Sequence, residues 1–269
     1  MDTELVVTIS VVGVALIALG VLLFTGALRE RALSLGPERD LGLPHSVHLA
    51  GVVAVCVYVL AMIVLGGLKD PAVGLVLQIA PFALIGLLIG RAMNTEGGAR
   101  KIGLVPRRPG RDVCWAGVAL IVGYALAGAA SLLTGYLAGL FGDAPDPVGH
   151  ETLRRLQEDP NAGLIVAVVI GAVVMAPLLE EPVFRGVMQT GLMRLMSGRR
   201  WPALVITAAV FSVVHWWAVT SWHGLVPLFV LGLVFGYVYE RTGSLLTPAL
   251  THAGFNVVNI LIALTVPAG

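Results

Sequence analysis

Charge is scarce in this 269-residue chain: Asp, Glu, Lys and Arg make up 12% of it, whereas hydrophobic residues make up 57%. Soluble domains carry about 25% charged residues, so this scarcity excludes an ordinary soluble globular protein. The net charge of +1 provides no basic excess for nucleic acid, which is not an expected partner. Only two cysteines are present, each inside or at the edge of an apolar run, and they indicate neither a disulfide framework nor a zinc knuckle.

Long apolar runs are what the chain has instead, with a mean hydropathy of +0.91. A membrane-spanning helix needs about 20 apolar residues. Eight such runs lie at about 5–28, 46–68, 72–93, 113–142, 162–196, 202–221, 224–240 and 244–266. The predicted fold is therefore all-α, a polytopic transmembrane bundle of about eight spans whose first partner is the lipid bilayer. We expect spans 1–4 within residues 1–145 and spans 5–8 within residues 160–266.

The basic residues gather in alternate loops. Thirteen of the 17 Lys and Arg residues fall in the loops after runs 1, 3, 5 and 7, and only three fall in the other loops. The positive-inside rule then places both termini outside and the basic loops in the cytoplasm. We expect an integral, multi-pass protein of the cell (plasma) membrane.

Polar side chains interrupt three of the apolar runs, where each is costly unless it has a partner. They are Glu180, Glu181 and Arg185 in the fifth run, His215 in the sixth, and His252 and Asn256 in the eighth. Glu181 and Arg185 are four residues apart, as are His252 and Asn256, so each pair shares one helix face. We expect the three helices to bring these groups together.

A carboxylate beside an imidazole can deprotonate water, and an imidazole with an amide can stabilise an oxyanion. Alternatively, the two histidines and a glutamate could hold a zinc ion that activates the water. Both arrangements point to hydrolysis of an acyl bond, with a peptide as the expected substrate. The sequence contains neither G-x-S-x-G nor H-E-x-x-H.

Three motifs resemble those of the CAAX-prenyl-protease and bacteriocin-processing (CPBP, or ABI) membrane peptidases. They are Glu180-Glu181-x-x-x-Arg185, Phe211-x-x-x-His215 and His252-x-x-x-Asn256, and the stretch from Phe235 to Leu245 is also similar. The resemblance covers roughly residues 160–262.

The resemblance implies a role for each motif residue. Glu180 and His215 would activate the water, His252 and Asn256 would stabilise the oxyanion, and Glu181 and Arg185 would support the site. The family has been described both as metalloproteases and as metal-independent glutamate proteases. The cofactor is therefore either one zinc ion, held by Glu180, His215 and His252, or none. The substrate would be a membrane-associated protein, and its prenylation is left open.

Other interpretations compete with this one. Glu181 and Arg185 alone could be a structural ion pair, and the polar set as a whole could belong to a proton-coupled transporter or to an inactive immunity or scaffold protein. The chain lacks the repeated halves typical of transporters, and all six motif residues are present.

Four local features give further expectations. Pro182, where the family more often has an apolar residue, should bend the fifth span together with Pro177. The site should lie between mid-bilayer and the inner leaflet and open to the cytoplasm. His150 and His223 fall in outer loops and should be solvated, and residues 151–159 should form a short surface helix.

Overall fold

The computed structural model describes residues 3–29, 33, 45–65, 83, 86–87, 89–91, 93–106, 108–141 and 149–265. This part of the chain is helical and contains no strand beyond one isolated bridge between His150 and Val219, which confirms the all-α prediction. The α-helices are α1 (Thr3–Phe24), α3 (His45–Leu65), α5 (Gly98–Lys101), α6 (Pro109–Leu140), α7 (Glu151–Glu158), α8 (Ala162–Val168), α9 (Ala176–Glu181), α10 (Thr190–Leu195), α11 (Arg200–Val213), α12 (Leu225–Thr242) and α13 (Leu246–Thr265). Two π-helices, η1 (Val169–Met175) and η2 (Pro182–Gln189), and one 3-10 turn, η3 (Trp222–Gly224), complete the set.

Within the described residues, four helical segments are long and apolar enough to cross a membrane: 109–140, 162–195, 222–242 and 246–265. Three shorter apolar helices, at 8–24, 49–61 and 200–213, overlap three further predicted spans. Most of the predicted span 72–93 lies outside the described residues. The chain is therefore an integral membrane protein, and the count of about eight spans stays a prediction.

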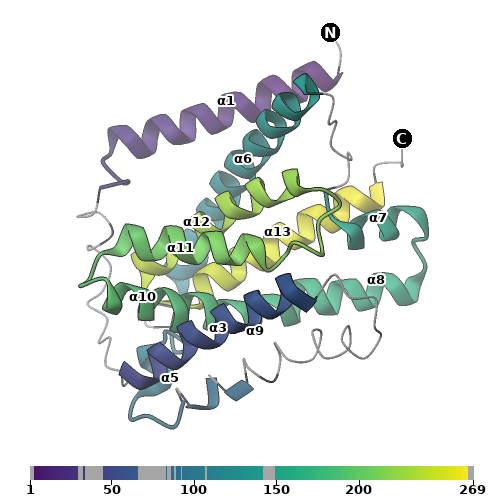
Figure 1. The fold of residues 1–269 in the computed structure, drawn as a ribbon. Helices are drawn as coiled ribbons and strands as arrows, with labels where there is room; N and C mark the ends of the chain where they lie inside the picture. The colour runs from purple at the N-terminus through teal and green to yellow at the C-terminus, as the bar shows by residue number, and fades with distance from the viewer. Residues whose placement is uncertain are drawn as a thin grey trace.

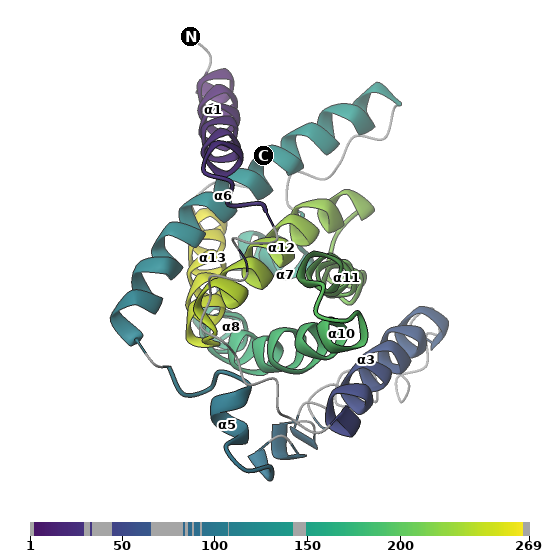
Figure 2. The same cartoon turned by 90° about the vertical axis from the view of Figure 1, so that its left-hand side faces the viewer.

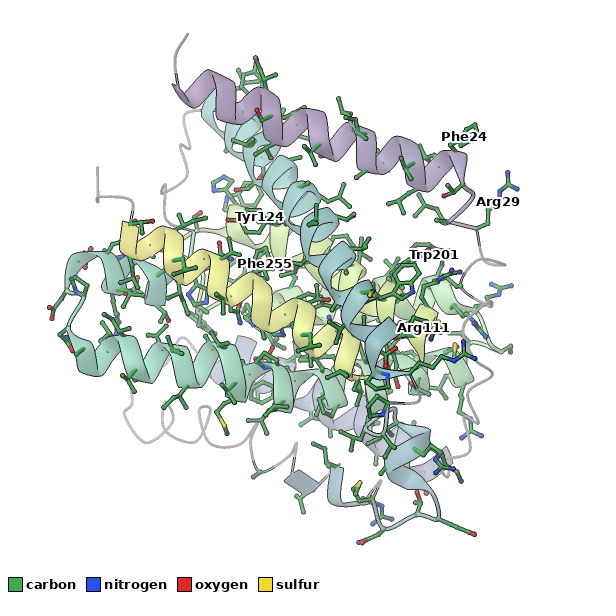
Figure 3. The ribbon with its side chains drawn as sticks, turned by 180° about the vertical axis from the view of Figure 1, so that it is seen from behind. Phe24, Arg29, Arg111, Tyr124, Trp201 and Phe255 are labelled. Atoms are coloured by element: carbon green, nitrogen blue, oxygen red, sulfur yellow. The ribbon has the colours of Figure 1, made fainter. Side chains whose placement is uncertain are left out.

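The long helix formed by α8, η1, α9, η2 and α10 runs along one side of the bundle, and α13 packs against its first half (Figure 1). Helix α12 contacts α6 on one side and α11 on the other. Helix α3 packs on η2 and α10, whereas α1 packs on α6, so these two helices lie on different sides of the bundle (Figure 2). The rings of Tyr124 and Phe255, 5.4 Å apart, join α6 to α13 (Figure 3).

The fifth predicted span is the least regular helix. Two π-helical segments, η1 and η2, flank the six residues of α9. Pro177 and Pro182 lie at the starts of α9 and η2, where each lacks the amide N–H that would continue the helical ladder. The two segments beside the prolines take the form of π-helix, which is often found at functional sites. The bend expected at Pro177 and Pro182 stays a prediction.

A polar ladder joins η2 to α12. Arg185 donates from Nη2 to the carbonyl of Gly232 at 3.4 Å. Gln189, one turn further along, donates from Nε2 to the carbonyl of Gly236 at 3.2 Å and to Glu240 Oε1 at 2.8 Å. The missing side chain of Gly236 faces Gln189 and allows η2 to approach α12 closely, whereas the missing side chain of Gly232 faces Ala208 and Phe211 of α11.

The close approach at Gly236 gives a stability prediction. A Cβ placed there would lie 2.7 Å from Gln189 Oε1 and 2.9 Å from Leu204 Cγ, so Gly236→Ala should cost about 1–3 kcal/mol of unfolding free energy. Gly117→Ala on α6 is the matched control, because its Cβ would meet nothing within 4 Å among the described residues. Thermal unfolding in detergent tests both variants, and equal midpoints would contradict the close packing.

Candidate active site

Glu181 is a fully buried carboxylate with two partners. Arg185, also fully buried, contacts it through Nη1 to Oε1 and Nε to Oε2, both at 3.2 Å. His252 on α13 contacts Oε1 through Nδ1 at 2.9 Å. The predicted pairing of Glu181 with Arg185 is therefore present, and the carboxylate also fixes the ring of His252. Because the carboxylate accepts, His252 donates from Nδ1 and directs Nε2 away from Glu181.

An aromatic layer surrounds this group. The Arg185 guanidinium lies 4.6 Å from the ring centre of Phe211 and 5.1 Å from that of Phe235. Phe235 stacks on His252 at 5.0 Å, and Phe211 packs against His215 at 4.8 Å. Phe211 therefore contacts the charged group and both histidines, since its ring centre also lies 6.0 Å from that of His252. The layer shields the cluster from lipid while its ring faces stabilise the cation.

Glu180 and His215 face each other in front of this layer. Glu180 Oε2 lies 3.9 Å from His215 Nε2, which is too long for a hydrogen bond. The opposite ring atom, Nδ1, lies 2.7 Å from the carbonyl of Phe211 and must donate to it, so a neutral His215 directs a lone pair towards Glu180. Both side chains are partly exposed, at 24% and 20%, unlike the buried Glu181. The two adjacent glutamates thus occupy different environments, as their helical offset predicts.

His215 lies outside a regular helix, which corrects the prediction of a span over 202–221. Helix α11 ends at Val213, and the backbone hydrogen bonds then shorten to three-residue steps, with His215 N–H donating to the Ser212 carbonyl at 3.1 Å. The chain turns back at this point. The neighbouring segment 149–151 supplies hydrogen bonds to Ala218 and Thr220 in place of those that a continued helix would have made.

Asn256 contacts a different part of the fifth span. In η1, the Ala176 N–H bonds to the Gly171 carbonyl five residues earlier, and the next donor in that pattern would be Pro177, which has none. The carbonyl of Ala172 is thus left for Asn256, whose Nδ2 donates to it at 2.6 Å. Asn256 shares a helix face with His252 but ties α13 to η1. Its role at an oxyanion stays a prediction.

The predicted zinc ligands do not form a metal site in this arrangement. Glu180 and His215 face each other, while His252 bonds to Glu181 through Nδ1 and keeps Nε2 free. Across the described ranges, no group of three His, Cys, Asp or Glu side chains is placed to hold a metal ion. The placement of the three donors therefore does not fit a zinc site, and the chemistry proposed below uses no metal step.

A cavity of about 490 Å³ lies elsewhere, between α1, α6 and α12. Its lining is mostly apolar and includes Val21, Val118 and Tyr237, but none of the six motif residues. We therefore locate the candidate site between α9, α11 and α13 from the chemistry of its side chains and not from the position of this cavity.

Two histidines expected to be solvated are not. His223 is buried, and its Nδ1 lies 3.1 Å from Ser221 Oγ. His150 is half-buried and caps α7, accepting at Nδ1 from the Thr152 N–H at 3.2 Å. Burial is the main cause that lowers the pKa of His150 to about 4. The electrostatic effect of nearby His215 acts in the same direction, and that of Glu151 opposes it. His150 is therefore neutral at pH 7.

The surface helix expected at 151–159 is present as α7, but it is also anchored. Leu156 is fully buried and packs with Ile260 and Ala263 of α13. The sequence did not predict this attachment, because a short charged helix with only two leucines, Leu153 and Leu156, is typical of an exposed segment. It also missed Gln189, although its spacing of four from Arg185 places it on the same helix face.

Taken together, fold and side chains define a helical membrane protein with a buried carboxylate–histidine centre. Residues 162–258 match the protein family described as type II CAAX prenyl endopeptidase Rce1-like, a segment that includes all six motif residues. This match confirms the predicted resemblance to the CPBP family over that segment.

A second comparison found a curated relative without a described function. An Escherichia coli protein described as an uncharacterized 24.3 kDa protein is 27% identical over 112 residues, which is 40% of this chain and 50% of that protein. The chain thus spans about half the length of the curated relative that it matches. No solved structure matches the chain.

The environment of Glu181 gives the second prediction. Glu181→Gln leaves Arg185 buried without a counter-charge, which typically costs about 3–5 kcal/mol. Glu180→Gln is the matched control, because Glu180 is partly exposed and its nearest ionisable partner is 3.9 Å away. Chemical unfolding in detergent should show a large loss of stability for the first variant and little change for the second. Similar losses in both would show that Glu181 is not the structural anion.

Proposed function

We propose that the protein is an intramembrane endopeptidase in which Glu180 and His215 activate the attacking water. The observation that carries the proposal is the 3.9 Å approach of Glu180 Oε2 to His215 Nε2, with both side chains partly exposed and both able to accept a proton. The Oε2 atom of Glu180 is itself buried, and it has no hydrogen-bond partner in the described part of the chain. The match to the Rce1-like family supports a CAAX-type endopeptidase.

The proposed first step follows from these two acceptors. One water molecule can donate a hydrogen bond to Glu180 Oε2 and another to His215 Nε2, because a gap of 3.9 Å suits a bridging water. Its oxygen lone pair then faces the carbonyl carbon of the substrate. As the C–O bond forms, the water proton passes to Glu180, and the same proton can later pass to the leaving amine.

Stabilisation of the oxyanion is assigned to α13. His252 donates from Nδ1 to Glu181, so a donor at Nε2 requires a second proton on the ring. The bond to Glu181 fixes the orientation of the ring, so the donor needs no rearrangement during the reaction. Asn256 has two amide N–H groups, of which one is bonded to Ala172, and the other is assigned to the oxyanion.

The wider proposals rest on the sequence. Residues 160–266 would form the peptidase core and residues 1–145 the helices that flank it in the membrane. The distribution of basic residues supports a plasma-membrane protein whose site opens to the cytoplasm. The substrate would be a membrane-associated protein, with a prenylated CAAX-type tail as the form that the family match favours. A proton-coupled transporter is not favoured by this match.

The central test is Glu180→Gln. A neutral amide of nearly the same shape cannot take a proton from water, so we expect kcat to fall by about 10²–10⁴-fold. The measurement is cleavage, in detergent, of a quenched fluorescent peptide that carries a farnesylated cysteine three residues from its end. Glu96→Gln, an exposed glutamate in a loop, should retain activity.

Detergent also removes any ion gradient, so cleavage there separates a peptidase from a transporter. Full activity in the Glu180 variant would contradict the proposed base. A chelator arm tests the metal question independently: loss of cleavage that zinc restores would contradict the metal-free mechanism.

A further inference from the structure

The position of His215 depends on a turn rather than on a helix. Its carbonyl accepts from the N–H groups of Ala218 at 2.8 Å and Val219 at 3.2 Å. Since α11 ends two residues earlier, these bonds and the Phe211 contact are what orient the ring. The contacts that fix residues 218–220 therefore also fix the position of the imidazole that faces Glu180.

An outer segment holds that turn. The Glu151 N–H donates to the Ala218 carbonyl at 2.9 Å, and the Thr220 N–H donates to the Gly149 carbonyl at 3.3 Å. Between these bonds, His150 and Val219 face each other as an antiparallel bridge. The segment 149–151 and the turn 218–220 thus form a short two-stranded pairing, which we name the outer pairing.

Close packing around Gly224 supports the outer pairing in addition to its backbone hydrogen bonds. A Cβ on Gly224 would lie 3.0 Å from Val219 Cγ1 and 3.1 Å from the Gly149 carbonyl, so three segments meet there without spare room. On its other side the pairing continues directly into α7, which His150 caps and Leu156 anchors to α13. A rigid connection therefore runs from the helix of His252 to the turn of His215.

We propose that the outer pairing positions His215 for water activation and that the backbone N–H of Glu151 is its principal positioning group. This inference rests on the proposed peptidase function and assigns to it a segment that lies outside the residues matched to the family. The pairing sets the gap between Glu180 and His215, and a shift of about 1 Å in such a gap can lower a rate by about 10²-fold.

One substitution removes the hydrogen bond between Glu151 and Ala218 and leaves α7 able to form. Glu151 is the first residue of α7, a position where proline is favoured because that N–H makes no helical bond. His150 before it is extended, with φ −134° and ψ 125°, as a residue before proline should be. Glu151→Pro therefore deletes the bond to Ala218 while α7 can still form.

The matched control is Glu151→Ala. Both variants lose the ion pairs of the Glu151 carboxylate with Arg154 and Arg155, but only the proline variant loses the N–H. With the farnesylated peptide as probe, we expect Glu151→Pro to lower kcat at least tenfold with KM within twofold, and Glu151→Ala to stay within twofold in both. Equal kcat values for the two variants would overturn the inference. A wild type that does not cleave the probe would instead overturn the proposed function, and the inference with it.

A crosslink tests the same inference without relying on the folding of the proline variant. His150 and Val219 are the directly opposed residues of the bridge, a geometry suited to a disulfide. The variant His150→Cys/Val219→Cys, with Cys56 and Cys114 changed to alanine, should have the same kcat within twofold when oxidised and when reduced. A loss of more than tenfold on oxidation would show that the two segments must separate during turnover, which contradicts a positioning role.

Discussion

A carboxylate at membrane depth cannot remain without partners, and Glu181 has two of them in a layer that excludes water. Its contacts to Arg185 and His252 join the fifth predicted span to the last one. Removing Arg185 would leave the buried charge of Glu181 uncompensated, and the hydrogen bond from His252 brings the two helices together at this point. The remaining features of the site are arranged around this contact. Glu180, next in the sequence, is thereby turned to the accessible side, where His215 faces it.

The same constraint explains the irregular backbone around it. Arg185 bonds to the carbonyl of Gly232 on α12, and η2 places its guanidinium among the aromatic rings of Phe211 and Phe235. Pro177 leaves a carbonyl in η1 unbonded, and Asn256 satisfies it from α13. Each departure from an ideal helix is thus matched by a side chain of a neighbouring helix, as the absence of water requires.

Much of this could be predicted, because charged residues in apolar runs admit few solutions. The pairing of Glu181 with Arg185 follows from their spacing, and the different environments of Glu180 and Glu181 follow from their offset on a helix. What could not be predicted depends on tertiary contacts. The end of α11 before His215 and the burial of His150 both arise from pairing between segments about 70 residues apart, for which no local pattern exists.

The central claim is that Glu180 and His215 act on one water as a unit, and a double-mutant cycle measures this directly. The rates kcat/KM of Glu180→Gln, His215→Ala and the double variant would be compared with wild type on the farnesylated peptide. Groups that act as a unit are strongly non-additive, so the account predicts that the double variant is no more than a few-fold slower than the slower single variant. Losses that multiply, with the double variant slower by the product of the two single effects, would contradict it.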